Sequence, residues 1–292
     1  MDVADKDSIQ TVMVVGSGSM GRGIILSFAM AGFNTIVLTR DPSHLTDLPQ
    51  GATAHQELPE KSPDLIIEAI PEKMELKEAL LKRLEQTYGD TPILASNTSS
   101  LPLDKMADGL KNPGRFIGIH YMHPAESLPM VEVIRVSQTS DRTLSQVKAA
   151  LKKTGKESIV LKKPIIGFLI NRLQHALLHE AYYLIEEEIV EAKDIDDFAK
   201  WMFGPRMCVT GLIEQKDISG LDTHALAQQG IVPHLHLSRK PSRVVQDKYE
   251  RGELGVKTGR GFYDWRSCDV TAHKIHAEHK LQRLLQLLKD DI

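Results

Sequence analysis

The sequence lacks the features that would cross-link a chain covalently or through metal ions, and it carries little net charge. It has only two cysteines, Cys208 and Cys268, which are too few for a disulfide framework or a thiolate zinc cluster. Lys and Arg number 36 and Asp and Glu 39, so the net charge is −3. Binding to a nucleic-acid backbone needs a strongly basic chain, and base stacking needs more aromatic residues than the 5% present here. We therefore expect no nucleic-acid partner.

Long hydrophobic runs are also missing. The longest apolar stretch of note, residues 165–170, is far shorter than the ~20 residues of a membrane-spanning helix. The first ten residues are polar and include three aspartates, unlike a secretory signal peptide. These patterns favour a cytoplasmic protein with no membrane partner.

The first half of the chain alternates short apolar strands with helices. Thr11–Val15 is a continuous β-branched run, typical of a strand buried on both faces of a parallel sheet. Helical patterns follow at 22–31 and 73–86, and further strand patterns lie at 34–38, 65–69, 93–95, 116–119 and 130–134. This alternation predicts an α/β fold, a Rossmann-type doubly wound parallel sheet.

The pattern changes near residue 164. From residue 167 onward the chain favours helices, at 168–189, 194–202, 223–237, 241–251 and 270–288. A length of 292 residues also fits two domains. We predict a dinucleotide-binding domain over 1–163 and a smaller all-α domain over 164–292.

A glycine-rich turn joins the first strand to the first helix. Gly16 would allow the tight turn, Gly18 would let the backbone approach a pyrophosphate, and Gly21 would let helix and strand pack closely. The free N–H groups at the helix N-terminus favour phosphate binding. Ser19 and Met20 share this turn and are candidate cofactor-binding residues with the glycines. The alternative interpretation is a glycine turn without a ligand.

The end of the second strand bears on the choice of cofactor. NAD sites usually place Asp or Glu there to accept from the ribose hydroxyls, whereas this chain has Arg40. Arginine can pair with a 2′-phosphate, which favours NADP over NAD. In the alternative interpretation, Asp41 takes the NAD role and Arg40 faces solvent.

One histidine and one glutamate stand out by position. A dehydrogenase needs a base for the hydroxyl proton, and imidazole suits this because its pKa lies near neutrality. His120 follows a predicted strand on the cofactor side of the sheet, and Glu132 lies on the next strand. A carboxylate there could orient the imidazole and stabilise its protonated form.

Four motifs in order make the chain resemble the 3-hydroxyacyl-CoA dehydrogenase family over nearly its whole length. They are Ser-Asn-Thr-Ser-Ser-Leu at 96–101, a His-aromatic turn at 120–124 followed by Val-Glu-Val at 131–133, Gly-Phe-x-x-Asn-Arg at 167–172, and the glycine-rich segment 252–263. The resemblance implies a Rossmann domain followed by a helical dimerisation domain, and hence a homodimer.

The resemblance also implies residue roles. It makes His120 the catalytic base and Glu132 its orienting partner, while Ser99 and Asn171 hydrogen-bond the reacting oxygen. For Ser99 and Asn171, a local turn or helix-capping role is the alternative.

On the cofactor side, the resemblance points to Glu72, Lys77 and Asn97. Histidines elsewhere, such as His175 and His179, are interpreted as surface or packing residues, and no metal site is predicted.

Two departures from the family bear on the substrate. Only 23 residues, 41–63, occupy a region where family members that act on acyl-CoA carry a longer helical excursion. This favours a small free hydroxy acid or similar alcohol, unless other surfaces hold CoA. His123 replaces the Asn of the family turn and Glu126 follows it; the two either read a polar substrate group or belong to a restructured surface turn.

The sequence thus predicts an NAD(P)-dependent oxidoreductase that interconverts a 3-hydroxy acid, or similar small secondary alcohol, and its ketone. One alternative is an NAD-dependent 3-hydroxyacyl-CoA dehydrogenase. Another is a non-catalytic nucleotide-binding protein on the same scaffold. The 6-phosphogluconate-like hydroxyacid dehydrogenases share the glycine loop but use a Lys-centred site, and the start of the second domain has no matching lysine motif but Asn171 instead.

Overall fold

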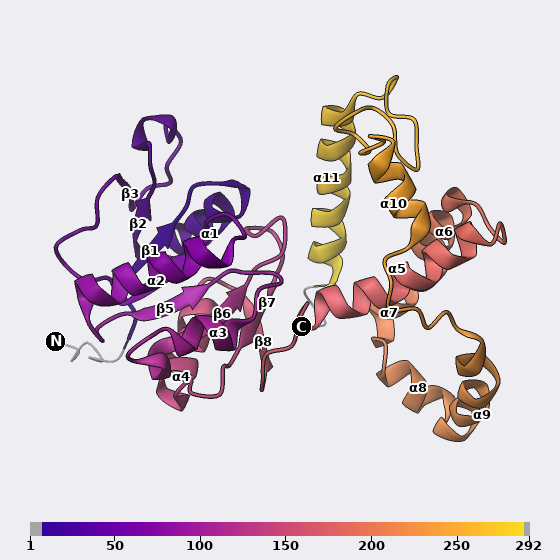
Figure 1. The fold of residues 1–292 in the computed structure, drawn as a ribbon, viewed down its shortest axis with the longest axis horizontal. Coiled ribbons are helices and arrows are strands. Elements are labelled where there is room, and N and C mark those ends of the chain that lie inside the picture. Colours follow the sequence, from indigo (N-terminus) through magenta and orange to yellow (C-terminus); the bar gives the residue numbers. More distant parts are fainter. Residues whose placement is uncertain (1–7, 289–292) are drawn as a thin grey trace. The chain divides into compact units, whose positions relative to one another are not determined.

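The computed structural model describes residues 8–288, and they form two units that divide after Arg172 (Figure 1). The first seven residues of the polar N-terminal segment lie outside the described range. The sequence pattern had placed the division after residue 163. Residues 164–172 belong with the first unit because Phe168 is buried in its core and the amides of Leu169 and Ile170 bind Glu132.

The first unit is built on one eight-stranded sheet with the order β3-β2-β1-β4-β5-β6-β7-β8. All neighbours are parallel except β6 and β7, which are antiparallel. The strands are β1 Thr11–Val15, β2 Asn34–Leu38, β3 Ala52–His55, β4 Leu65–Glu68, β5 Ile93–Ser96, β6 Phe116–His120, β7 Met130–Ile134 and β8 Glu157–Leu161. The predicted Rossmann-type fold is confirmed.

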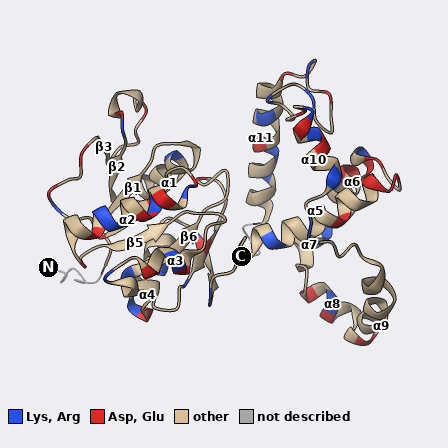
Figure 2. Cartoon of the chain, viewed as in Figure 1, with Lys and Arg blue, Asp and Glu red and all other residues tan. Residues whose placement is uncertain are grey.

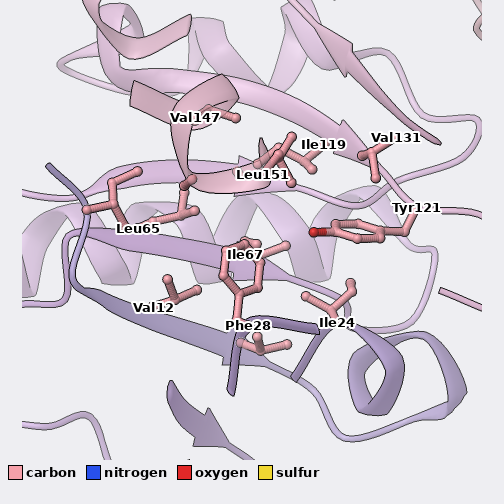
Figure 3. Packing of buried hydrophobic residues seen from close by; sticks show 14 of the residues in the cluster. Val12, Ile24, Phe28, Leu65, Ile67, Ile119, Tyr121, Val131, Val147 and Leu151 are labelled. Atoms are coloured by element: carbon pink, nitrogen blue, oxygen red, sulfur yellow. The ribbon is translucent and has the colours of Figure 1, made fainter. Parts of the chain in front are cut away.

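Helices cover both faces of this sheet. In β1, Val12 and Val14 face the side covered by α1 (Ser19–Met30) and α4 (Asp141–Lys153), while Met13 and Val15 face α2 (Met74–Tyr88) and α3 (Leu103–Asp108). Figure 3 shows the first of these two cores, with side chains of α1 and α4 packed on those of the central strands. Burial on both faces explains why the central strands read as continuous apolar runs.

The sheet order creates the place where a ligand can bind. β1 lies between β2 and β4, so the connections after β1 and β4 run to opposite faces of the sheet. A crevice opens at the carboxyl ends of the strands at such a switch point. Gly16 follows β1, and Glu68 ends β4 at this edge.

Two strands, β3 and β8, and two helices, α3 and α4, of this unit were not expected from the sequence. β3 is short and partly exposed, and β8 mixes Glu and Ser with apolar residues, so neither shows the continuous apolar run of a central strand. α4 begins at an N-cap, Ser140, whose side chain accepts a hydrogen bond from the Thr143 amide, a signal that the sequence does contain.

The second unit is all-helical, as predicted. Its helices are α5 Ile170–Glu186, which starts in the first unit, α6 Ala192–Phe198, α7 Gly204–Thr210, α8 Glu214–Ser219, α9 Leu221–Ile231, α10 Arg243–Glu250 and α11 Val270–Leu288. Charged residues of both signs are spread over both units (Figure 2). Among residues 8–288, no helix is long and apolar enough to cross a membrane.

Candidate active site

His120 and Glu132 form a buried pair. His120 ends β6 and Glu132 lies within β7, and the antiparallel register sets the two residues directly opposite each other. The Nδ1 atom of His120 lies 2.6 Å from Oε2 of Glu132, and the two residues are 5% and 2% exposed. A carboxylate on Nδ1 selects the tautomer that leaves Nε2 free to accept a proton.

The second oxygen of Glu132 binds the start of α5. The amides of Leu169 and Ile170 donate to its Oε1 at 2.8 and 2.9 Å. Burial raises the pKa of Glu132, but the bond from His120 and these two amides outweigh it, and the net shift is downward. Glu132 is therefore ionised at neutral pH, and it holds the start of α5, in which Asn171 is the second residue.

Phe168 is a site residue that the sequence reasoning missed. Its ring centroid lies 5.3 Å from that of His120, and the side chain is 2% exposed. Its φ of 45° is unusual for a residue with a side chain, and such strain is found mainly where the surroundings dictate it. The signal was present, since Phe168 stands three residues before Asn171 in the motif at 167–172.

The loop after β5 is wrapped around Glu72. Oε1 of this carboxylate accepts the Thr98 hydroxyl at 2.6 Å and the amides of Ser99 and Ser100 at 3.0 and 3.1 Å. The hydroxyls of Ser99 and Ser100 also donate to it, at 3.3 and 3.1 Å. Partial burial raises the pKa of Glu72, but the bond from Thr98 and the charge of Lys77 lower it to about 2. Glu72 is thus a fixed negative charge that orders the loop carrying Ser99.

Asn97 connects this loop to the strand end that carries His120. Its Oδ1 accepts the backbone N–H of Tyr121 at 2.8 Å. The structure therefore gathers four predicted residues, Asn97, Ser99, His120 and Glu132, where β5 and β6 end and the antiparallel β7 runs beside them.

Lys77 lies deeper than expected for a residue that contacts a cofactor. Its side chain is 1% exposed, and its Nζ donates to both oxygens of Glu68 at 2.8 and 2.7 Å. The same Nζ lies 3.3 Å from Oε2 of Glu72 and 3.3 Å from the carbonyl of Ile70. Protein acceptors thus surround the ammonium group of Lys77. Its link to the edge of the sheet is the ion pair with Glu72.

The glycine turn has the geometry of a phosphate cradle. Gly16 has φ of +110°, and a Cβ there would lie 2.7 Å from the carbonyl oxygen of Ala69. A Cβ on Gly21 would lie 2.0 Å from the Gly16 oxygen, whereas one on Gly18 would meet nothing within 4 Å. α1 begins directly after Gly18 with no side-chain cap, so its first amides are available to an anion. The turn therefore fits a dinucleotide, with Met20 packed against the core beside it.

Asp41 is engaged in its own turn, while Arg40 is exposed. The Asp41 carboxylate accepts the Ser43 amide and hydroxyl at 3.0 and 2.6 Å and lies 3.0 Å from His44 Nε2. Within residues 8–288, Arg40 forms no ion pair. Asp41 thus stabilises its own turn with its side chain 53% exposed, and the exposed guanidinium of Arg40 stands just after the strand end.

His123 and Glu126 lie beside α1. The Nδ1 atom of the exposed His123 is 3.5 Å from the hydroxyl of Ser19. A Cβ on Gly23 would come within 2.4 Å of Oε2 of Glu126, so this carboxylate lies over the helix surface at that glycine. Their expected role in reading a substrate stays a prediction.

In the described part of the chain, no group of three or more His, Cys, Asp or Glu could hold a metal ion.

Comparisons with known proteins agree with this geometry. The family model "3-hydroxyacyl-CoA dehydrogenase, NAD binding domain" matches residues 11–63 and 50–164, and the model of the C-terminal domain of the same family matches 167–265. The NAD-binding-domain model matches in two parts that overlap at residues 50–63, in the segment that follows β2.

Three relatives match this chain over nearly their whole length. A probable 3-hydroxybutyryl-CoA dehydrogenase of Deinococcus radiodurans is 32% identical, covering 86% of this chain and 99% of its own. The (S)-3-hydroxybutyryl-CoA dehydrogenase PaaH1 of Ralstonia eutropha is 29% identical with a TM-score of 0.70, covering 89% of this chain and 100% of its own.

The third is a 5-formyl-3-hydroxy-2-methylpyridine 4-carboxylate 5-dehydrogenase. The protein of this name from Mesorhizobium japonicum is 24% identical, covering 96% of this chain and 99% of its own. A crystal structure of such an enzyme, described as an NAD+ dependent dismutase, has a TM-score of 0.90 at 25% identity, with coverage of 96% and 99%. From these matches, the chain belongs to the 3-hydroxyacyl-CoA dehydrogenase family and is an NAD-dependent dehydrogenase that acts on a CH–OH group.

Proposed function

We propose that this dehydrogenase acts on a small hydroxy acid, or a similarly compact alcohol, that carries no CoA, with His120 as the catalytic base. The observation that carries the proposal is the buried 2.6 Å bond from His120 to Glu132 at the carboxyl edge of the sheet. Asn171 and Ser99 hold the hydroxyl oxygen, and Nε2 of His120 takes its proton. A bound nicotinamide would supply the hydride acceptor for the carbon that carries this hydroxyl.

Each residue of this set lowers the barrier in a defined way. Glu132 stabilises the imidazolium that forms, and its ionised state is supported by the amides of Leu169 and Ile170. Holding the alcohol, base and cofactor together removes much of the entropic part of the barrier. In the reductive direction, the protonated His120 returns the proton to the carbonyl oxygen.

The short segment after β2 supports a substrate without CoA. It holds only a 3-10 turn, Pro42–His44, and β3. The family resemblance leads us to expect a longer helical excursion here in members that act on acyl-CoA. The structural relative with a TM-score of 0.90 is named for a pyridine substrate that carries a formyl group. A hydrated aldehyde offers the same pair of C–H and O–H bonds as a secondary alcohol, so aldehydes are included among the proposed substrates.

The second candidate is a 3-hydroxyacyl-CoA dehydrogenase, which the relative at 32% identity favours. Initial rates with acetoacetyl-CoA, small 3-keto acids and small aromatic aldehydes separate the two. We expect kcat/KM to be higher for one of the compounds without CoA. A higher value for acetoacetyl-CoA selects the second candidate, and cofactor binding with no turnover of any of them selects a non-catalytic protein.

The role of His120 is tested by His120→Gln. We expect turnover to fall by about 10²–10⁴-fold because general-base catalysis is lost, while cofactor affinity stays the same. His276→Gln is the matched control, since His276 is exposed on α11 and belongs to none of the motifs that carry the proposed site. Near-normal activity of His120→Gln would remove the basis of the proposal.

We further propose that NADP is accepted, with Arg40 pairing to its 2′-phosphate. The engagement of Asp41 with Ser43 and His44 supports this choice. Titration with NADH and NADPH, followed by nucleotide fluorescence, should show that NADPH binds at least as tightly as NADH, and Arg40→Gln should weaken NADPH binding at least tenfold with little effect on NADH. Preference for NADH in the unaltered protein contradicts the assignment.

A homodimer is proposed for the helical unit. None of residues 173–288 is buried, and large apolar side chains such as Trp201, Val209 and Leu237 are 75%, 81% and 78% exposed. Apolar surface of this extent indicates a partner surface.

The cytoplasmic location stays a prediction, which fractionation of cells that express the tagged chain would test.

A further inference from the structure

Glu68 and Lys77 form an ion pair that is shut off from solvent. Glu68 ends β4 with its side chain fully buried, and Lys77 lies in the first turns of α2. Besides Lys77, Glu68 accepts the Ser96 hydroxyl and the Ile70 amide, the latter at 3.3 Å. Each oxygen of Glu68 thus has at least two donors, so the carboxylate is held in a single orientation.

Stability alone gives a poor account of this pair. Taking two charges out of water costs several kcal/mol per ion, and well-packed neutral residues of similar size are often equally stabilising. The pair stands where β4 ends at the switch point of the sheet, next to Gly16, rather than in the middle of the core. Its position therefore points to a role at this edge.

That role is visible in what Lys77 touches beyond Glu68. Its ammonium lies 3.3 Å from Oε2 of Glu72, whose other oxygen gathers the Thr98, Ser99 and Ser100 donors. Glu72 lies in the irregular segment between β4 and α2, and its side chain is 36% exposed. No strand or helix holds this carboxylate, so the buried cation is its anchor.

We propose that Glu68 is a positioning residue for the active site: by orienting Lys77 it fixes Glu72, which in turn fixes the loop 97–101 and the Ser99 hydroxyl. The contact of Ser99 with the substrate rests on the proposed function, whereas the connection from Glu68 to the loop does not. A loop that is loosened by even 1 Å can slow a reaction by about 100-fold.

The test is the double variant Glu68→Gln/Lys77→Met, which replaces the pair by neutral residues of similar size and keeps an acceptor for Ser96. Amide hydrogen exchange, followed by NMR, measures the Ser99 and Ser100 amides, which bind Glu72 directly. We expect their exchange to speed up at least tenfold while the melting temperature stays near that of the unaltered protein. With a substrate that the unaltered protein turns over, kcat should fall by about 100-fold.

Glu85→Ala is the matched control on the same helix. Glu85 accepts the amides of Lys111 and Asn112 at 2.9 and 2.8 Å, so its loss should speed exchange there and leave Ser99 and Ser100 unchanged. If the double variant does not fold, the same exchange measurement on Glu68→Gln decides the question. Unchanged protection of Ser99 and Ser100 in the folded variant overturns the proposal.

The two proposals fail in different ways. If the unaltered protein turns over no compound that lacks CoA, the proposed function fails, but the exchange result still stands. If turnover is normal and the exchange of Ser99 and Ser100 does not respond to Glu68, only the positioning role is lost.

Discussion

At the scale of single residues, the two carboxylate oxygens of Glu132 bind two different parts of the site. Oε2 binds His120, and Oε1 receives the first amides of α5. A carboxylate can serve both because it only accepts hydrogen bonds. The orientation of the imidazole and the start of α5 are thus set by the same side chain.

The first prediction follows from that chemistry. In Glu132→Gln, the amide oxygen can still accept from Leu169 and Ile170, while the NH₂ group faces Nδ1 of His120. The donor now on that side selects the wrong tautomer, so we expect kcat to fall by roughly a thousandfold to ten-thousandfold. The melting temperature and cofactor affinity should stay close to normal. Retained activity would show that His120 does not need this carboxylate.

The second prediction concerns the hydroxyl of Tyr121. It points into the apolar cluster of Figure 3, near Ile67, and has no hydrogen-bond partner. Burial raises the pKa of Tyr121 far above its usual value. Because an unpaired buried hydroxyl is costly, Tyr121→Phe should raise the free energy of unfolding by about 1 kcal/mol in urea titrations. A loss of stability would mean that the hydroxyl has a partner, such as a buried water.

The third prediction concerns pH and Glu72. Its pKa in the folded state, about 2, lies below the ordinary value of 4.5. The stability that it contributes is therefore fully present above the ordinary value and is lost as the pH falls toward 2. Thermal unfolding at about pH 6 and about pH 3 should show that the difference between the unaltered protein and Glu72→Gln shrinks on acidification. A difference that does not depend on pH would contradict the ionised state assigned to Glu72.

At the scale of elements, the contact of α1 with the glycine turn decides whether a cofactor can be held. The turn passes so close to the helix that a methyl group on Gly21 would meet the Gly16 backbone at 2.0 Å. Backbone atoms cannot give way as the end of a flexible side chain can. The spacing of the glycines is therefore a packing requirement as well as a binding one.

The fourth prediction tests this contact. Gly21→Ala should destabilise the protein by about 2 kcal/mol and weaken dinucleotide binding, because the turn must move to admit the methyl group. Gly230→Ala in α9 is the control, since a Cβ there meets nothing within 4 Å. In an open helical position, alanine is favoured over glycine by about 0.5–1 kcal/mol. Equal effects of the two changes would argue against a tight turn.

At the scale of the whole molecule, the two units differ in how they are stabilised. The sheet of the first unit has two apolar cores of its own, one on each face. The second unit, over residues 173–288, has no buried residue. Helices without a buried face gain little from packing within their own unit.

The fifth prediction follows from this contrast. If two copies cover the apolar helices, the thermal midpoint of the protein should rise with protein concentration, as mass action requires. Light scattering should give twice the mass of the 32.6 kDa chain. A monomer with a midpoint that does not depend on concentration would contradict the dimer.

The sequence by itself determined the fold class and the identity of the pair. That information is local, within short windows of the chain: it lies in the continuous apolar strands, in the glycine turn at Gly16, Gly18 and Gly21, and in the spacing of His120 and Glu132. β3 and β8 were missed because they lie at the sheet edges, where burial is partial and the apolar pattern is weak.

Only the tertiary structure decided how the candidate site is supported. Three contacts depend on segments far apart in the chain: Glu132 meets the start of α5, Phe168 packs on His120, and Glu72 binds the Ser99 amide. Such contacts leave no periodic pattern in a single sequence, because each charged or aromatic residue has many equally plausible environments until the fold selects one. Burial and partner choice, and with them the ionised state of Glu72 and Glu132, are therefore properties of the folded chain.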